Sequence, residues 1–330
     1  MTGQQHETSM EVALHAAVVA VKDHEPLVLS APVTAMGRTF PALPYGTFDP
    51  EQHRTMERGL RLWVEEQADL RVGYVEQLYT FGDRNRLRTA HGEQVHQISV
   101  GYLALVRHQS SEGLITENES ARWTRWYDHF PWEDWRSGPP DVLIEHILPA
   151  LRSWVLTGEV APRHAAKRRA RFHLAYGHDA AQQPDKLDGF DEERVLERYE
   201  LMYEAGLVEE AVIDRQLSHD QPDPLPGLAM YHDHRRILAT AMSRLRGKMK
   251  YRPVVFELMG SAFTLTDLQK TVESLSGHLL HKQNFRRLVD TANLVEPTGS
   301  HEAKTGGRPA ALFRFREQVT RERPAPGLRV

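Results

Sequence analysis

The chain has 330 residues, enough for about two domains, and 40% of them are hydrophobic. It contains no cysteine, which excludes disulfides and thiolate metal sites. The net charge of −4 is unevenly distributed: residues 231–330 hold 18 Lys and Arg against 9 Asp and Glu, whereas residues 1–230 hold 23 against 36.

The N-terminal part predicts a sheet followed by a helix. The first ten residues are polar, and Val12–Val21 is too short and interrupted for a membrane span or signal peptide, so we expect a soluble cytoplasmic protein. The β-branched content of Glu11–Val21 predicts a strand, with Pro26–Ser30 as its hairpin partner. After the proline-punctuated Phe40–Gly46, a helix is predicted from Asp49 through Gln67.

Two further strands, Tyr74–Phe81 and Gln97–Val106, are predicted around a polar loop. Arginines on such a loop can clamp the phosphates of a bound nucleotide, and strand aromatics can stack on a base. The alternative is a charged hairpin loop with two core aromatics. The candidate contacts are Arg84 and Arg86 on the loop, and Phe81 and Tyr102 on the strands.

The order strand, strand, Leu-Pro-x-Gly, helix resembles the entry to a Nudix fold, which implies a helix whose glutamates bind a divalent metal. Aligning Arg61 with the arginine of the family pattern places Leu62 where a Glu belongs and His53 at the upstream Glu position, whereas Glu65 and Glu66 match the paired glutamates. Because Mg²⁺ requires several hard oxygen ligands, we expect a Nudix shell without efficient hydrolysis. Glu65 and Glu66 then hold one ion or a ribose hydroxyl, or remain exposed helix carboxylates.

Residues from Glu112 to Gln221 show a helical and aromatic pattern. Six aromatic residues between Trp123 and Trp135 predict an amphipathic helix broken at Pro131, with most rings in packing contacts rather than in a ligand cage. Further helices are predicted over Asp141–Leu156, Pro162–Phe172 and Phe190–Leu217, followed by a linker at Pro222–Pro226.

One basic cluster, Lys167–Arg171, lies outside the C-terminal part. Pairing with the acidic Asp188–Glu200 segment is favoured over contact with DNA flanks, since opposite charges in an acidic body tend to pair. The next predicted helix, Tyr231–Met249, carries Ile237, Leu238, Ala241 and Leu245 on one side and is expected to couple two domains. The histidines show no ligand spacing, so no metal site is predicted.

The C-terminal stretch predicts a helix-turn-helix. The first helix is expected to begin at Thr266, capped with Gln269, and to end at Ser276-Gly277. In the second helix, Phe285, Leu288, Val289 and Ala292 fall on one face, which leaves a polar and mostly cationic face opposite. Arg and Gln can read bases in the major groove, and Lys282 would neutralise phosphate.

Two short strands, Leu294–Pro297 and Ala311–Phe315, flank a loop that we predict to be a wing, whose Arg308 can enter a minor groove or hold a phosphate. Basic helix faces are as often merely solvated, but the cationic C-terminus on an acidic body favours nucleic acid. The candidate DNA-binding residues are Thr264, Lys282, Gln283, Asn284, Arg286, Arg287, Lys304 and Arg308.

The segments Phe263–Gln269, Asn284–Arg287, Leu294–Gly299 and Gly307–Ala310 with Phe313–Phe315 resemble the C-terminal winged helix of the NrtR-like, Nudix-related regulators of NAD metabolism, and the chain's length resembles their NadQ-type branch. The resemblance implies an α+β fold: a Nudix-like sensor domain over 1–112, a helical region over 113–230 and a winged helix over 231–330.

The same resemblance implies a homodimeric repressor of NAD genes that binds operator DNA and no membrane, needs no cofactor, and responds to ADP-ribose, NAD or ATP. The alternative is an active Nudix hydrolase of ADP-ribose-type substrates with an accessory interaction domain. A third possibility, a constitutive architectural DNA binder, would show weak sequence preference and steep salt dependence.

Overall fold

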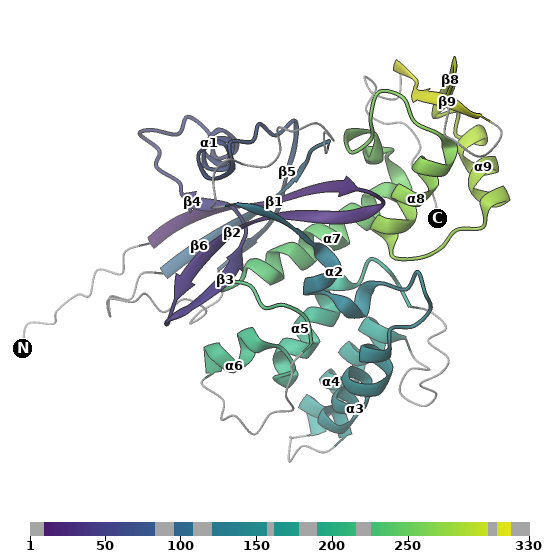
Figure 1. Cartoon of the computed structure of the whole chain (residues 1–330). Coiled ribbons are helices and arrows are strands. Elements are labelled where there is room, and N and C mark those ends of the chain that lie inside the picture. The colour runs from purple at the N-terminus through teal and green to yellow at the C-terminus, as the bar shows by residue number, and fades with distance from the viewer. Residues whose placement is uncertain are drawn as a thin grey trace, which may run out of the picture.

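A computed structural model describes residues 10–82, 96–107, 121–156, 162–177, 190–215, 226–302 and 309–317 (Figure 1). It has the α+β architecture expected: an N-terminal mixed sheet, a helical middle part and a C-terminal winged helix. In chain order the elements are β1 (Met10–Lys22), β2 (Glu25–Ala35), β3 (Arg38–Ala42), β4 (Tyr45–Thr47), α1 (Met56–Ala68), β5 (Tyr74–Phe81), β6 (His96–Leu105), β7 (Arg122–Arg125), α2 (Trp126–His129), η1 (Pro131–Glu133), η2 (Val142–Ile147), α3 (Leu148–Leu156), α4 (Pro162–Tyr176), α5 (Val195–Ala205), α6 (Glu209–Arg215), α7 (His234–Tyr251), η4 (Val254–Glu257), α8 (Leu265–Ser276), α9 (Lys282–Thr291), β8 (Val295–Glu302) and β9 (Ala310–Phe315).

The sheet runs in the order β3-β2-β1-β6-β5, with β4 added to β1 and β7 added to β2. The predicted hairpin is confirmed, because β1 and β2 pair antiparallel with Val19 opposite Val28. Strands β1 and β6 pair in parallel at the centre of the sheet. On β1, Leu14 packs toward α1 while Ala17 packs toward α7, so both faces of this strand are buried and its sequence is continuously apolar.

Helix α1 begins at Met56, seven residues later than Asp49, where the helix was predicted. Residues before it form turns in which Asp49 accepts backbone and side-chain hydrogen bonds from Glu51 and Gln52. The Thr55 side chain caps the helix by accepting from the backbone N–H of Arg58. The predicted start was therefore wrong because Asp49 closes a turn instead of capping a helix.

The aromatic stretch is not one helix broken at Pro131. Trp123 lies on β7, whose residue Thr124 pairs with Val28 of β2, and only one helical turn follows before Pro131. Pairing with β2 satisfies this backbone and overrides the helical spacing of the rings. Trp126 and Trp132 are fully buried, in line with the predicted packing role.

The predicted helix over Phe190–Leu217 is two helices, α5 and α6, because Gly206 ends α5 in the left-handed conformation (φ 75°). The expected pairing of the Lys167–Arg171 cluster with Asp188–Glu200 is also corrected. Within the described residues, Arg171 pairs with Glu204, outside that segment. The reason is that the carboxylates of 191–200 are already paired with cations of α5 and α7.

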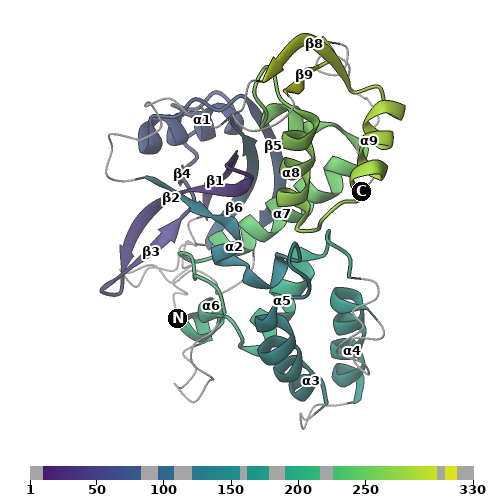
Figure 2. The ribbon, with the colours of Figure 1, turned by 45° about the vertical axis from the view of Figure 1, so that its right-hand side comes forward.

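Helix α7 crosses beneath the sheet and reaches the winged helix (Figures 1 and 2). Its predicted apolar face is confirmed, since Ile237 and Leu245 are fully buried. A single cluster of buried side chains continues from Leu103 of β6 through Met242 of α7 to Val272 of α8, so all three segments share one core. Among the described residues, no helix is long and apolar enough to cross a bilayer.

Candidate nucleic-acid interface

The first helix of the winged helix, α8, is capped by Thr264, two residues before the predicted cap. The Thr264 hydroxyl accepts from the backbone N–H of Asp267 at 3.1 Å, and the Asp267 carboxylate accepts from the Thr264 backbone at 3.1 Å. This reciprocal pair is a capping box. Thr264 is only 6% exposed, so the structure gives its side chain a capping role. The predicted end at Gly277 is confirmed, with φ 80°.

The turn between α8 and α9 is fixed by Glu273. Its carboxylate accepts from the backbone N–H of Leu280 at 2.9 Å and from the side chain of Gln269 at 2.8 Å. Gln269 also donates to the Leu280 carbonyl at 2.9 Å. These contacts fasten the turn that leads into α9 to the side of α8.

The second helix, α9, presents the predicted polar face to solvent. Phe285 and Val289 are buried against α8 and the wing strands, in agreement with the predicted apolar face. The polar residues on the opposite side, Lys282, Gln283, Asn284, Arg286 and Arg287, are all exposed. Within the described part of the chain, the three cations of this face form no ion pair. An unpaired cationic helix face of this kind suits a polyanion.

The wing strands β8 and β9 pair antiparallel, with Val295 opposite Phe315. A reciprocal pair of backbone hydrogen bonds between Phe263 and Phe313 joins β9 to the residue preceding the α8 cap. The two predicted wing-loop contacts, Lys304 and Arg308, lie outside the described residues. In Figure 2 the wing strands β8 and β9 lie next to α9.

Sequence reasoning missed one exposed cation of this surface, Lys270 on α8. In helix-turn-helix proteins the helix preceding the recognition helix crosses the DNA backbone, which makes Lys270 a candidate phosphate contact. Its position three residues after Asp267, on the solvent side of an amphipathic helix, was the available signal.

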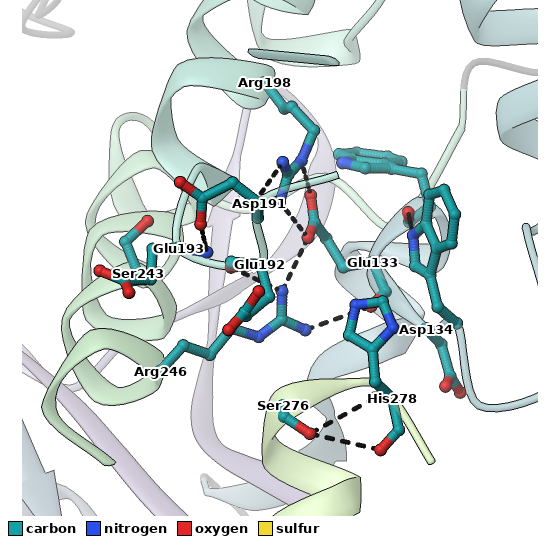
Figure 3. A network of polar contacts seen from close by, with 12 residues as sticks. Glu133, Asp134, Asp191, Glu192, Glu193, Arg198, Ser243, Arg246, Ser276 and His278 are labelled. Carbon is teal, nitrogen blue, oxygen red and sulfur yellow. Dashed lines mark hydrogen bonds and ion pairs between the residues drawn. The ribbon is translucent and has the colours of Figure 1, made fainter. Parts of the chain in front are cut away.

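A buried ionic network joins the winged helix to the helical middle part (Figure 3). The Glu133 carboxylate accepts from Arg198 at 2.6 and 2.8 Å and from Arg246 at 2.8 Å, and all three side chains are fully buried. Arg246 also donates to the carbonyl of Leu275 in the last turn of α8 at 3.0 Å. One guanidinium on α7 thus holds the helical part and α8 together.

Further contacts at this junction involve the C-terminal end of α8. The Tyr127 hydroxyl donates to the Ser274 carbonyl at 2.7 Å, and the Trp135 backbone N–H donates to the Gly277 carbonyl at 2.8 Å. These bonds satisfy carbonyls that a helix leaves unpaired at its end. We call Glu133, Arg198, Arg246 and Tyr127 the junction network.

The sheet also touches the winged helix directly. At the tip of the β1–β2 hairpin, His24 lies 4.0 Å from Asp267 of α8. Arg136 holds the same tip, since it donates to the His24 carbonyl at 3.2 Å and to Glu25 at 3.0 and 3.1 Å. The winged helix is therefore in contact with both the sheet and the helical part.

The candidate ligand-binding aromatics of the sheet do not lie together. Phe81 is buried on the face that packs toward α7, under the guanidinium of Arg236, whereas Tyr102 is buried on the face that packs toward α1. Burial raises the pKa of Tyr102. The two rings therefore cannot stack on the same base. The other candidates from this region, Arg84 and Arg86, lie outside the described residues.

The paired glutamates of α1 differ in their surroundings. Glu65 forms an ion pair with Arg71 at 2.9 Å, while Glu66 is exposed. Arg61 donates to Glu57 and to the carbonyls of Val72 and Gly73, and so it holds the end of the helix against the following loop. Among the described residues, no group of three His, Asp or Glu side chains is arranged to hold a metal ion.

Sequence reasoning also missed a cluster of rings between β1, β4 and the start of α7. His15 on β1 stacks on Tyr45 with a centroid distance of 5.6 Å and meets His234 of α7 edge-on at 4.8 Å. Burial lowers the pKa of His15 to about 3 and that of His234 well below its usual value, so both are neutral at pH 7. The signal was the position of His15 within an apolar strand.

Comparison with known proteins identifies the C-terminal part. Residues 255–315 match the family model described as the NrtR DNA-binding winged helix domain. The chain is 40% identical over 88 residues to a protein of Acinetobacter baylyi called the ADPR responsive transcriptional repressor NtrR. That alignment covers 27% of this chain and 35% of the relative, so the chain matches about a third of the relative's length.

Solved structures extend the likeness in fold to most of the chain. NrtR of Shewanella oneidensis in complex with a 27mer DNA has a TM-score of 0.55 at 19% identity, over 93% of this chain and 94% of that one. A MutT/nudix family protein of Enterococcus faecalis has a TM-score of 0.50 at 15% identity, over 96% and 90% of the two chains. The chain thus resembles NrtR: residues 255–315 match the NrtR DNA-binding winged helix domain, and the chain shares its fold with an NrtR and with a MutT/nudix family protein.

Proposed function

We propose that this protein is a sequence-specific transcriptional repressor that acts in the cytoplasm and whose affinity for DNA is controlled by a bound nucleotide. The observation that carries the proposal is the exposed face of α9, where Lys282, Arg286 and Arg287 form no ion pair within the described residues. In a winged helix matched by a DNA-binding family model, this face suits the major groove. Gln283, Arg286 and Arg287 then read bases, and Lys282 holds a phosphate.

The effector is ADP-ribose, NAD or ATP, and it binds the Nudix-like body, residues 1–112 in our division of the chain. The name of the Acinetobacter relative supports ADP-ribose first. The genes controlled are those of NAD biosynthesis or salvage. The exposed Glu66 and the cationic loop with Arg84 and Arg86 offer polar contacts for ribose and phosphate.

The regulator acts as a homodimer, because DNA-reading modules commonly bind two half-sites one helical turn apart. The effector alters DNA affinity only through its different affinity for two arrangements of the winged helices. In this chain the proposed effector-binding body contacts the winged helix directly, since His24 on the β1–β2 hairpin and Arg246 on α7 both contact α8. A shift of the sheet against α7 therefore moves α8 and α9 together.

The test begins with selection of duplexes from a random pool by the full chain. Binding of the selected duplex is then measured by electrophoretic shift while ADP-ribose, NAD and ATP are titrated separately. We expect one nucleotide to change the dissociation constant at least tenfold. If none changes it, the protein is a DNA binder without the proposed switch; if no duplex is enriched, the proposed function is wrong.

The hydrolase alternative is separated by a second assay. The same protein is incubated with ADP-ribose and Mg²⁺ or Mn²⁺, and release of AMP is measured. We expect slow or no turnover, because Leu62 and His53 stand where metal-binding glutamates belong in the Nudix pattern and Glu65 is engaged by Arg71. Fast turnover that is lost in Glu66→Gln would favour the hydrolase.

A further inference from the structure

We propose that the exposed face of α4 that carries Arg163 and Lys167 is a second DNA-contacting surface that holds backbone phosphates flanking the segment read by α9. The proposal rests on the proposed function and extends its footprint. It assigns a partner to a basic surface that lies in the acidic part of the chain, far from α9 in sequence.

Helix α4 is cationic over its first ten residues. Its fifteen residues include Arg163, Lys167, Arg168, Arg169 and Arg171 and contain no Asp or Glu. The side chains of Arg163, Lys167 and Arg169 are exposed, and Arg163 and Lys167 are one helical turn apart on the same face. The described residues of the preceding helix, α3, add Arg152 and likewise contain no Asp or Glu.

Two of the five cations have structural partners. The Arg168 guanidinium lies 4.1 Å from the centroid of the Trp154 ring and donates to the Trp154 carbonyl at 3.3 Å. Arg171 forms an ion pair with Glu204 of α5. For Arg163, Lys167 and Arg169, the described part of the chain supplies no ion-pair partner. Within the described residues, these three are therefore the cations of α4 without an ion-pair partner.

Among the described residues, the carboxylates of 191–200 are paired elsewhere. Asp191 and Glu197 pair with Arg194 at 3.2 and 2.9 Å. Glu192 and Glu193 pair with Lys250 at 2.6 and 2.8 Å, and Glu200 pairs with Arg236. Within the described part of the chain, these five carboxylates therefore pair with Arg194, Lys250 and Arg236, and none of them neutralises the exposed cations of α4.

The position of α4 fits a duplex that also meets α9. In Figure 2 both helices lie along the same side of the molecule, α9 above and α4 below, with α1 on the opposite side. Helix α4 packs inward through Phe172 and Tyr176, which are buried in the shared core, so its exposed cations point away from the molecule. A duplex that extends from the segment bound by α9 toward α4 would bring its phosphates to these cations.

The chemistry of the surface favours phosphate over bases. Lys and Arg spaced one helical turn apart neutralise neighbouring phosphates, and this releases condensed counterions without reading sequence. Each contact contributes about 0.9 to the slope of log affinity against log salt. The α4 face should therefore add affinity and salt dependence, but no base preference.

The experiment uses the full chain and the duplex it selects from a random pool, trimmed to the protected core. The core is compared with the same core carrying flanks of about two helical turns, ~20 base pairs, made either of normal phosphodiester or of uncharged methylphosphonate. The variant is Arg163→Ala/Lys167→Ala. The matched control, Arg54→Ala/Arg58→Ala, removes two exposed cations beside and on α1, on the opposite side.

For the wild type we expect phosphodiester flanks to tighten binding about tenfold, and methylphosphonate flanks to give no gain. In the α4 variant the gain should vanish and the salt slope on flanked DNA should fall by about two, while affinity for the core stays at the wild-type value. That unchanged core affinity also shows that the variant is folded. The α1 control should behave as the wild type.

Three results would overturn the proposal. They are an α4 variant that keeps the full flank gain, an α4 variant that loses affinity for the core, and an α1 control that loses as much as the α4 variant. A wild type that binds no core duplex would instead remove the proposed function itself. The two failures are therefore distinguishable within one set of titrations.

Discussion

Arg286 and Arg287 on α9 lie in solvent without an ion-pair partner among the described residues, whereas Arg198, Arg235 and Arg246 are at most 1% exposed. Each buried guanidinium meets a carboxylate, Glu133 for Arg198 and Arg246, and Glu210 for Arg235. The buried ones also donate to backbone carbonyls. The same residue type is thus used as an internal connector in one region and as a free charge in the other.

The difference separates stability from recognition. A buried charge is tolerated only when it is paired and hydrogen-bonded. Removing its partner leaves an unpaired charge in a medium of low polarity, which destabilises the folded state. An exposed, unpaired charge contributes little to stability and remains available to an external anion. Variants of the buried set should therefore change unfolding, and variants of the exposed set should change DNA binding alone.

The largest effect is expected from Glu133→Ala. It leaves Arg198 and Arg246 buried without their shared carboxylate, which should lower the free energy of unfolding by roughly 3–5 kcal/mol. Urea denaturation followed by circular dichroism measures it. A loss below about 1 kcal/mol would mean that the junction network contributes little to the free energy of unfolding.

On the exposed side, Arg287→Ala should cost about 1–3 kcal/mol of discrimination between the selected duplex and one with a changed base pair. Lys282→Ala should instead weaken all duplexes about equally and flatten the salt slope by about one. Both should unfold like the wild type, because both side chains are exposed. Anisotropy titrations at several salt concentrations measure these effects. The contrast between base reading and phosphate contact fails if the two variants behave alike.

The buried histidines supply a prediction for pH. Burial lowers the native pKa of His15 to about 3, below its unfolded value near 6.5, so the unfolded state binds more protons between those values. The free energy of unfolding is therefore highest above pH 6.5, where the ring is neutral in both states, and decreases as the pH falls below that value. Between pH 7 and pH 5 the loss should be about 2 kcal/mol. His15→Phe should reduce the fall by that amount in urea titrations, and equal slopes for both proteins would contradict it.

A smaller effect is expected from Tyr127→Phe, which removes the bond to the Ser274 carbonyl and the bond that the hydroxyl accepts from Arg246, and leaves the ring in place. Loss of these two buried hydrogen bonds should cost roughly 1–2 kcal/mol, because Arg246 keeps its other partners. Thermal unfolding measures the cost, and amide exchange at the end of α8 shows whether it is local. Unchanged exchange there would place the effect outside the junction network.

The smallest effect is expected from Glu296→Ala. Its carboxylate lies 2.8 Å from the guanidinium of Arg314, which is largely exposed on the wing strand. The ion pair should therefore contribute no more than about 0.5 kcal/mol to the free energy of unfolding. The freed Arg314 should instead tighten DNA binding slightly at low salt. A large loss of stability would show that exposure does not separate the two sets of arginines.

Sequence reasoning was most successful where local pattern decides the outcome. The buried face of α9 follows from the spacing of Phe285 and Val289, and Gly277 marks the end of α8. It failed where distant residues decide. The start of α1 depends on a turn at Asp49, the strand at Trp123 depends on pairing with β2, and neither is encoded in local spacing.

Of the candidate interface, the helix and its exposed face were predictable, while its attachment was not. Glu133 and Arg246 are 113 residues apart in the chain, and no pattern links them. The partner of Arg171 in the Lys167–Arg171 cluster was misassigned for the same reason, since the described carboxylates of 191–200 pair with Arg194, Arg236 and Lys250. The effector contacts at Arg84 and Arg86 stay predictions, because these residues lie outside the described part of the chain.

The most direct test of the central claim uses the absence of native cysteine, which makes any introduced thiol unique. An iron–EDTA cleavage reagent is attached at Asn284→Cys on α9 and, as a control, at Glu66→Cys on α1, both exposed positions. Cleavage of the selected duplex is then mapped. The account predicts strong cuts confined to the protected site from position 284 and none above background from position 66. Equal patterns from both, or no cuts from position 284, would contradict the claim that α9 lies against DNA.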